Sequence, residues 1–314
     1  MARPARPLSG SKAAKAAPGG RRPLRLVRRR SAAAARGYPA AASDHPSHWT
    51  RPHVRTLAIA SGKGGVGKSN LAANLAVALG ELGARVLLLD ADIAQANLDL
   101  LLGVNPRFDL QHVLSGHKSL EEIVVQGPRG VSLVPASSGV PELAELDDYR
   151  LECLIRGLGN LESSADIILI DAASGTSRQV VTFCLAADEV VIVTTPEMPA
   201  FSDAYAMIKL LQQRGLTHPP RLVVNAVGSA DEAEEVAHRL RLVARRFLKL
   251  EPEMWGYVPF DAAIPRAVRR QEPVVTAYPR SAAAAAYRAL AAQLWETSAG
   301  PDSPQQSLVE KLEA

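Results

Sequence analysis

Residues Ser61–Ser69 read SGKGGVGKS, and this stretch decides the fold. It follows an apolar segment, Leu57–Ala60, and opens a segment with helical periodicity, Lys68–Leu82. A glycine-rich loop between a strand and a helix can turn its backbone amides toward an anion, and the positive end of the helix dipole adds to the attraction. The pattern G-x-x-x-x-G-K-[ST] is that of a phosphate-binding loop. It is met here by Gly62, Gly67, Lys68 and Ser69.

Each residue of the loop has an expected task at a nucleotide. The Lys68 ammonium neutralises β- and γ-phosphate charge, and the Ser69 hydroxyl is a ligand for Mg²⁺. Lys63 is a second lysine inside the loop, too close to the nucleotide to be only a solvated charge. We therefore expect a nucleoside triphosphate with Mg²⁺ here. The predicted contacts are Gly62, Lys63, Gly64, Gly65, Val66, Gly67, Lys68, Ser69 and Asn70.

Outward from the loop, continuous runs of Val, Ile and Leu alternate with helical segments. Such runs predict a parallel sheet buried on both faces. The expected fold is α/β, a three-layer, doubly wound, mainly parallel sheet of the P-loop NTPase type. The expected strands are Leu57–Ala60, Arg85–Leu89, Val131–Val134, Asp166–Ile170, Glu189–Thr194, Arg221–Val224 and Tyr257–Val258. The expected helices include Lys68–Leu82, Asp203–Gln213, Ala233–Leu248 and Ala282–Trp295.

Three carboxylates stand at the ends of expected strands. Asp90 and Asp92 follow Arg85–Leu89, and Asp171 ends the strand in DIILID. Parallel sheets bind ligands at the carboxyl ends of their strands, so we expect these side chains in the ligand crevice. Asp171 fits the second Walker motif, which holds Mg²⁺ directly or through water. The structural alternative for Asp92 and Asp171 is capping of a following helix, which for Asp92 would span Ile93–Leu102.

The second lysine of the loop gives the sequence a family resemblance. KGGVGKS, at residues 63–69, is similar to the deviant phosphate loop of the MinD/ParA ATPases, within the SIMIBI class of P-loop NTPases. The resemblance implies that Lys63 reaches the nucleotide of a partner subunit, so that ATP holds a homodimer face to face. It makes Lys63, Lys68 and Asp92 catalytic, with Asp92, 24 residues after Lys68, positioning the attacking water. The Mg²⁺ residues are then Ser69, Asp90 and Asp171.

Other positions are assigned by resemblance alone. Asn225 and Pro259 match the places where the family holds adenine, although a strand-end Asn is more often a turn former and a Pro there a strand stop. Ala94, Ala173 and Ser174 depart from the family's two switch motifs. Because alanine restricts the backbone freedom that switching loops use, we expect a slow ATPase.

Four longer stretches resemble one branch of the class, the FlhG or FleN ATPases that regulate flagellar number and placement. They cover residues 90–104, 131–139, 191–211 and 256–275. In that branch the ATP-bound dimer binds a GTPase like that of the signal recognition particle (SRP), C-ring proteins of the flagellar basal body, or a flagellar transcription activator. The branch's N-terminal motif D-Q-A-x-x-L-R does not occur in residues 1–54.

Charge divides the chain unequally. Of its 36 Lys and Arg and 32 Asp and Glu, residues 1–55 hold 13 bases and one acid, so the remainder has a net charge of −8. Composition predicts a disordered basic tail over 1–54, an ATPase domain over 55–297, and a polar linker with a short terminal helix over 298–314. The tail is interpreted as a solvated extension, a nucleic-acid or lipid arm, or a transit peptide.

No apolar stretch reaches the roughly 18 residues that a membrane span needs. We expect a cytoplasmic protein, with peripheral attachment at the inner face of the cell membrane as an alternative. Ser307–Ala314 offers a short apolar face toward an anionic membrane surface, but it carries two acids against one base. Cys153 and Cys184 are expected to be helical core residues, which argues against an iron–sulfur cluster.

Three other functions remain open. One is a slow or non-hydrolysing ATP-bound scaffold, suggested by Ala94, Ala173 and Ser174. Another is ParA-type partitioning on DNA, which the acidic body disfavours because phosphate contacts need clustered bases. The third is a cell-division-site MinD, which differs mainly by a basic terminal helix.

Overall fold

One mainly parallel sheet forms the centre of the computed structural model, which describes residues 54–93, 95–137, 148–216 and 218–298. Its strand order is β3-β4-β2-β5-β1-β6-β7-β8, and every neighbouring pair is parallel except β3 with β4. The predicted α/β fold is confirmed. The strands are β1 Arg55–Ser61, β2 Val86–Ala91, β3 Val125–Gln126, β4 Val131–Val134, β5 Ile167–Ser174, β6 Glu189–Thr194, β7 Arg221–Val227 and β8 Glu253–Pro259.

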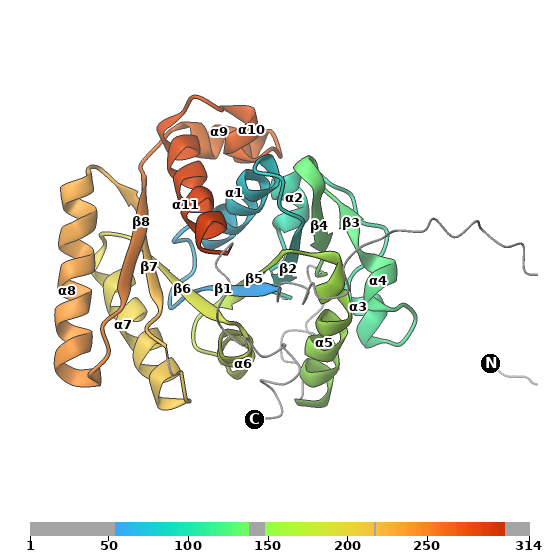
Figure 1. Cartoon of the computed structure of the whole chain (residues 1–314), viewed down its shortest axis with the longest axis horizontal. Coiled ribbons are helices and arrows are strands. Elements are labelled where there is room, and N and C mark those ends of the chain that lie inside the picture. The colour runs from blue at the N-terminus through green and yellow to red at the C-terminus, as the bar shows by residue number, and fades with distance from the viewer. Residues whose placement is uncertain (1–53, 94, 138–147, 217, 299–314) are drawn as a thin grey trace, which may run out of the picture. The chain divides into compact units, whose positions relative to one another are not determined.

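Helices cover both faces of this sheet (Figure 1). On one face lie α1 Lys68–Glu81, α2 Leu98–Leu102, α9 Ala263–Arg269, α10 Val274–Ala277 and α11 Ala282–Ser298. On the other lie α3 Leu110–Leu114, α4 Leu120–Ile123, α5 Asp148–Leu161, α6 Arg178–Ala186, α7 Met198–Gln213 and α8 Ala230–Leu248. Two short 3₁₀ turns span Pro128–Gly130 and Glu162–Ser164.

Alternation along β1 shows how the sheet divides the core. Leu57 and Ile59 are fully buried with residues of α1 and α11, whereas Ala58 and Ala60 are buried with residues of α5–α8. Successive side chains of a strand point to opposite faces, so one apolar run fills both layers. Burying one Leu or Ile contributes about 1.5–3 kcal/mol. β1 pairs with β5 and β6, so the loop that follows it starts at the middle of the sheet's carboxyl edge.

Five strands, β1, β2, β5, β7 and β8, run further than the sequence predicts, and two of these extensions contain site carboxylates. β2 continues through Asp90 to Ala91, and β5 continues through Asp171 to Ser174, so both carboxylates lie within strands rather than after them. Pairing explains the extension, because the ends of β2 and β5 are bonded to each other in parallel register. The two-residue antiparallel strand β3 is not among the predicted strands, since so short a segment carries no periodicity.

The helix expected over Ile93–Leu102 is much shorter. Of the described residues in that range only Leu98–Leu102 are helical, and Ile93 and Gln95–Asn97 are not. The cause is a side chain from the preceding strand: Asp90 Oδ2 accepts the backbone N–H groups of Asn97 and Leu98, at 3.1 Å each. A carboxylate at this position does the work of a helix N-cap and fixes where the helix begins.

Cys153 does not fit the prediction that both cysteines are core residues. It is exposed on α5, where it falls on the outer side of an amphipathic helix, whereas Cys184 is buried on α6. Burial raises the pKa of the Cys184 thiol to about 12. The predictions for the N-terminal tail, for Ala94 and for the terminal segment concern residues outside those described. None of the described helices is both long enough and apolar enough to cross a bilayer.

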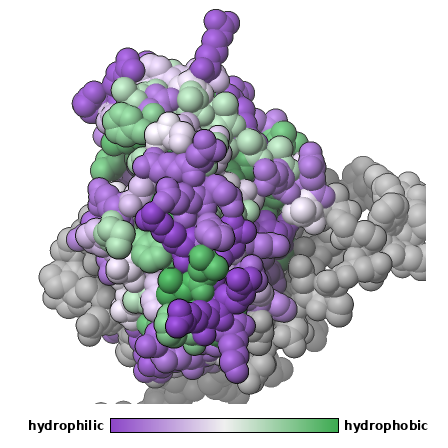
Figure 2. All heavy atoms as spheres, turned by 90° about the vertical axis from the view of Figure 1, so that its left-hand side faces the viewer, coloured by the Kyte–Doolittle hydropathy of each residue, from purple (hydrophilic) through white to green (hydrophobic). Residues whose placement is uncertain are grey.

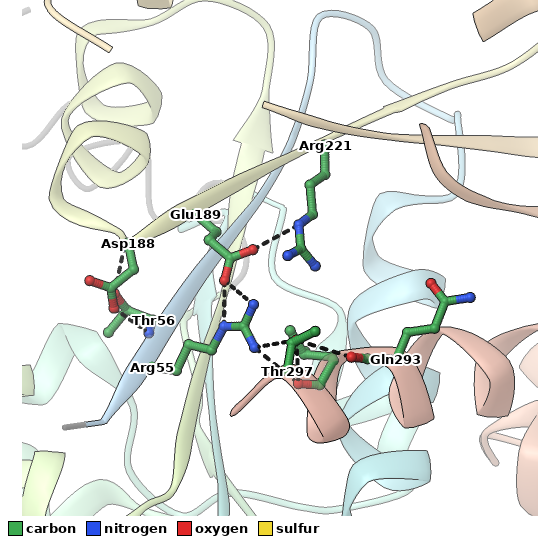
Figure 3. Close-up of polar contacts among 8 residues, drawn as sticks. Arg55, Thr56, Asp188, Glu189, Arg221, Gln293 and Thr297 are labelled. Carbon is green, nitrogen blue, oxygen red and sulfur yellow. Dashed lines mark hydrogen bonds and ion pairs between the residues drawn. The ribbon is translucent and has the colours of Figure 1, made fainter. Parts of the chain in front are cut away.

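A polar network at the amino edge of the sheet fastens the last helix (Figure 3). Arg55 in β1 pairs with Glu189 in β6, and Glu189 Oε2 lies 2.8 Å from Nε of Arg221 in β7. Arg55 also donates to the Leu294 carbonyl at 3.0 Å and to the Thr297 hydroxyl at 2.8 Å, both in α11. Arg55 and Glu189 together therefore join three strands, β1, β6 and β7, to α11.

Candidate functional site

The loop between β1 and α1 has the backbone that a phosphate cradle needs. Gly65 and Gly67 have φ angles of 82° and 91°, in the left-handed region that residues with a Cβ avoid. Gly67 is the N-cap of α1, and no side chain caps that helix. The N–H groups of its first turn are therefore available to the oxygens of an anion at the positive end of the helix dipole.

Two close approaches hold the loop in place. A Cβ at Gly62 would lie 2.2 Å from the backbone oxygen of Asp203 in α7, and a Cβ at Gly67 would lie 2.1 Å from Nδ2 of Asn225 in β7. Neither position has room for a side chain. The Asn225 amide also donates to the Val66 carbonyl at 2.7 Å. The loop is thus packed against residues more than a hundred positions away in the sequence.

Lys68 and Asp171 form a buried ion pair behind the loop. Lys68 Nζ lies 2.7 Å from Asp171 Oδ1, and the two side chains are 4% and 0% exposed. Burial raises the pKa of Asp171, and the Lys68 ammonium opposes that rise. Ser69 lies near enough to lower the pKa of the same carboxyl group. Among the described residues, Asp171 Oδ2 accepts no hydrogen bond of normal geometry although it is fully buried.

Asp90 lies beside Asp171 on the neighbouring strand, where its charge is unfavourable. The two residues are register partners of β2 and β5. Burial, and after it the charge of Asp171, raises the pKa of Asp90 to about 8. Besides the two bonds to the start of α2, Asp90 accepts the Asp92 N–H at 3.2 Å. Asp90 therefore organises the loop that follows β2.

Asp92 is half-buried in that loop. Its Oδ1 accepts the Gln95 N–H at 3.2 Å, so it caps a turn rather than a helix. Its charge raises the pKa of Asp171, which places the two carboxylates near each other. The structure thus brings together four of the predicted site residues at the carboxyl edge of the sheet. They are Lys68, Asp90, Asp92 and Asp171.

Lys63 has surroundings opposite to those of Lys68. Its Nζ lies 3.1 Å from Oε2 of Glu197, the residue before α7, and the two side chains are 39% and 68% exposed. The Ser61 hydroxyl donates to the Lys63 carbonyl at 2.9 Å. An ion pair this exposed contributes about 0–1 kcal/mol, so Lys63 can exchange Glu197 for another anion at little cost.

The two predicted adenine residues are placed differently from each other. Asn225 contacts the loop through its amide nitrogen, while its Oδ1 is buried without a hydrogen-bond partner among the described residues. The next residue, Ala226, has a left-handed φ of 57°, which puts a bulge between β7 and β8. Pro259 ends β8 and lines a cavity of about 570 Å³ against α11, a cavity whose lining contains no residue of the loop.

Sequence reasoning missed two residues that contact the loop. Glu197 forms an ion pair with Lys63, and the Asp203 backbone lies against Gly62. Glu197 lies in the turn after β6 and Asp203 in the first half of α7, within the stretch 191–211 whose resemblance to the branch named no contact with the loop. The contact comes from the parallel pairing of β1 with β6, which sets the two loops side by side.

The family is decided by a match over most of the chain. Residues 57–274 match the model of the CobQ/CobB/MinD/ParA nucleotide binding domain. The chain belongs to this MinD/ParA family. The match covers the loop, the carboxylates and the strands that carry them.

The chain is also similar to individual members of the MinD/ParA family. The antiactivator FleN of Pseudomonas aeruginosa is 38% identical over 262 residues, covering 82% of this chain and 93% of FleN. The flagellum site-determining protein YlxH of Helicobacter pylori is 36% identical over 70% of this chain and 74% of its own. A solved structure of MinD from Pyrococcus horikoshii, complexed with Mg-ADP, superposes with a TM-score of 0.68 at 29% identity, covering 78% of this chain and 98% of that one.

The residues of this MinD/ParA chain fit a magnesium ion. Among the residues that the structure describes, the buried Asp171 Oδ2 accepts no hydrogen bond of normal geometry, and the Ser69 hydroxyl lies near the same group. Asp90 and Asp92 add two more carboxylates against the single buried ammonium of Lys68. Hard oxygen ligands with excess negative charge are what Mg²⁺ requires, usually together with the phosphates of a nucleotide.

Proposed function

We propose that the chain is an ATP-dependent dimerising switch ATPase that regulates flagellar number or placement. It converts ATP and water to ADP and phosphate, and the ATP-bound dimer is the form that binds partners. The observation that carries the proposal is the contrast between the two lysines of one loop. Lys68 is buried on Asp171, whereas Lys63 is exposed and weakly held by Glu197.

Each side chain has one task in this proposal. Loop amides from Gly62 to Asn70 and the Lys68 ammonium bind the triphosphate, with Asn225 and Pro259 on the adenine side. Mg²⁺, when bound, neutralises phosphate charge and is held by Ser69 and Asp171. Asp90 is a positioning residue, because its oxygens are already bonded to the backbone of the loop that carries Asp92.

The reaction itself needs two further groups. Asp92 orients the attacking water, and Lys63 leaves Glu197 to reach the nucleotide of the second subunit. A positive charge delivered across an interface stabilises the charge on the transferring phosphoryl group, in the manner of an arginine finger. It also makes dimerisation depend on the triphosphate, because the lysine has no anion to reach without one.

The first test is dimerisation of Lys63→Ala. Sedimentation with ATP and Mg²⁺ is expected to show a dimer for the unchanged protein and a monomer for Lys63→Ala. Lys118→Ala is the matched control, because Lys118 is another partly exposed lysine in an ion pair, with Glu122 at 2.9 Å. The control should dimerise normally. If Lys63→Ala dimerises with the affinity of the unchanged chain, the proposal is wrong.

The flagellar role rests on similarity. FleN and YlxH, both flagellar by name or branch, match more closely than Bacillus subtilis MinD, which is 31% identical. Proposed partners are an SRP-like GTPase, C-ring proteins or, as the name antiactivator suggests for FleN, a transcription activator. The proposed place is the cytoplasm, with contact to an anionic membrane surface as an alternative. Deleting the gene should change the number of flagella per cell, and an unchanged count with altered septum placement would favour a MinD role.

A second candidate is a scaffold that keeps ATP and hardly turns over. It is favoured by the way the second switch is held. β5 runs on through Ala173 and Ser174, Ser174 is a register partner of Ser61, and the Gly175 N–H donates to the Ser61 carbonyl at 2.9 Å. Strand pairing of this kind opposes a large switch movement. Phosphate release, measured with and without lipid vesicles and partner, separates a stimulated ATPase from a scaffold.

A further inference from the structure

The solvent-exposed side of helix α8 carries a stripe of charged residues. The two halves of this stripe have charges of opposite sign. The helix packs on the sheet through a side that includes Val236, Leu240 and Ala244, and its other side is exposed. Figure 2 looks onto the side of the molecule where α8 lies in Figure 1, and this face is mainly hydrophilic with a small hydrophobic area among the polar side chains. The central stripe consists of Glu234, Glu235, His238, Leu242, Arg245 and Arg246.

The spacing of this α8 stripe is symmetric along the helix. A two-fold axis level with Leu240 would set each acid of one copy opposite a base of another, with the two helices antiparallel. At 3.6 residues per turn, all six positions lie within about 60° of the middle of the outer face. The charged pairs that face each other on the same side of the seam are Glu234 with Arg245 and Glu235 with Arg246, and His238 lies level with Leu242 near its middle.

A charge gradient alone would indicate nothing, because acids near the N-terminus and bases near the C-terminus stabilise any helix through its dipole. Two observations go further. Arg245 and Arg246 form no ion pair with any described residue, and Leu242 is 42% exposed in the middle of the stripe. Glu234 and Glu235 pair within the helix with Arg241 and Arg239, through exposed contacts that exchange readily.

We propose that the α8 stripe is a docking surface for α8 of a second copy of this chain. The two helices lie antiparallel about a two-fold axis, and the contact needs no nucleotide. A helix of this length is about 28 Å long, so the contact is small and its charges are screened by salt. The association is therefore weak and strongest at low ionic strength.

The test exchanges charges between the two halves of the stripe. The full chain is studied without nucleotide and with a chelator, so that the proposed ATP-bound dimer does not form. Arg245→Glu with Arg246→Glu makes an acidic stripe, and Glu234→Arg with Glu235→Arg makes a basic one. Each variant alone should associate about tenfold or more weakly in low-salt sedimentation, because like charges face each other. Mixing the two should restore association, because every facing pair is again opposite in sign.

The matched control is Arg269→Glu with Arg280→Glu, which changes the net charge equally at exposed positions outside the stripe. It should self-associate like the unchanged chain. Cross-linking adds a readout that keeps the charges: His238→Cys with Leu242→Cys should form a disulfide between copies under oxidising conditions. The proposal is overturned if the two variants do not associate when mixed. It is also overturned if no cross-link forms, or if the unchanged chain is monomeric at low salt. The ATP-dependent dimer is unaffected by these outcomes.

Discussion

Three buried charges, Lys68, Asp90 and Asp171, share the space behind the phosphate loop. One ammonium faces two carboxylates there, and the pKa of Asp90 is raised to about 8 because both burial and Asp171 oppose its ionisation. Removing a partner from such a buried set costs several kcal/mol, because it leaves a charge uncompensated. Carboxylate oxygens are also the ligands that a hard cation prefers, so the unfavourable pairing of Asp90 with Asp171 and the fit of the site to a metal have one cause.

At the residue scale, Gly67 and Gly65 make a matched pair. Both have a left-handed φ, and a Cβ at Gly65 would meet nothing within 4 Å, whereas one at Gly67 would strike Asn225. We expect Gly65→Ala to cost about 1–2 kcal/mol from backbone strain alone. Gly67→Ala should cost more and should also abolish ATP binding, because Asn225 must leave the Val66 carbonyl. Urea unfolding and a fluorescent ATP analogue measure the two effects.

The double variant Gly67→Ala with Asn225→Ala isolates the clash from the strain. Removing the Asn225 amide makes room for the new methyl group but also removes its bond to the Val66 carbonyl, so the double variant should lose no more stability than Gly65→Ala and Asn225→Ala lose together. If Gly65→Ala and Gly67→Ala lose equal stability, the close approach of β7 to the loop is not what holds it.

At the scale of elements, one carboxylate accepts hydrogen bonds from the first turns of two helices. Asp261 Oδ1 accepts the Ala263 N–H at 2.8 Å, at the start of α9, and Oδ2 accepts the Ala283 N–H at 3.0 Å, at the start of α11. These backbone donors lower the pKa of Asp261. Because both helices cover the same face of the sheet, one side chain fixes where each of them begins.

We predict that Asp261→Ala lowers stability by about 1–2 kcal/mol near neutral pH, the usual cost of losing a helix cap. The folded pKa lies below the unfolded one, so the carboxylate stabilises the fold above the unfolded value, near 3.8, and this contribution is lost as the pH falls through the folded pKa. Thermal unfolding at neutral and at acid pH should therefore show the variant and the unchanged chain converging on acidification.

Asp231→Asn serves as the control for this cap. Asp231 is exposed in the first turn of α8, a helix that Ser229 already caps. Its loss should cost only a few tenths of a kcal/mol through the helix dipole. An Asp261 variant whose deficit persists at low pH would mean that packing, not the carboxylate, accounts for the loss.

At the scale of the whole molecule, Arg55 joins the first strand to the last helix (Figure 3). Its partner Glu189 would remain half-satisfied by Arg221 if Arg55 were removed. We predict that Arg55→Ala lowers the free energy of unfolding by about 2–4 kcal/mol, below the full cost of breaking a buried pair because of that remaining contact. Hydrogen exchange should become faster along α11.

The control is Arg85→Ala, which removes another arginine–carboxylate pair. Arg85 binds Asp166 at 2.6 Å, but its side chain is 61% exposed. Exposed pairs are worth about 0–1 kcal/mol, so the loss should be much smaller than at Arg55. Equal losses for the two variants would argue that burial at the amino edge adds nothing.

The local patterns predicted most elements, for reasons visible in each. Val131–Val134 and Glu189–Thr194 have the predicted bounds, because a strand buried on both faces is mostly apolar and so stands out locally in the sequence. The bounds that failed depend on distant partners. β5 is extended by its pairing with β2, and α2 is shortened by Asp90, which is eight residues from Leu98 in sequence.

What the sequence by itself determined is the phosphate loop and the sheet that carries it, since both follow from glycines, apolar runs and spacings along the chain. Only the tertiary structure decided which charges meet. Lys68 is 103 positions from Asp171, and Lys63 is 134 from Glu197. Parallel strands return the chain to the same edge after long excursions, so the neighbours of a site residue depend on strand order. A sequence read locally does not contain that order.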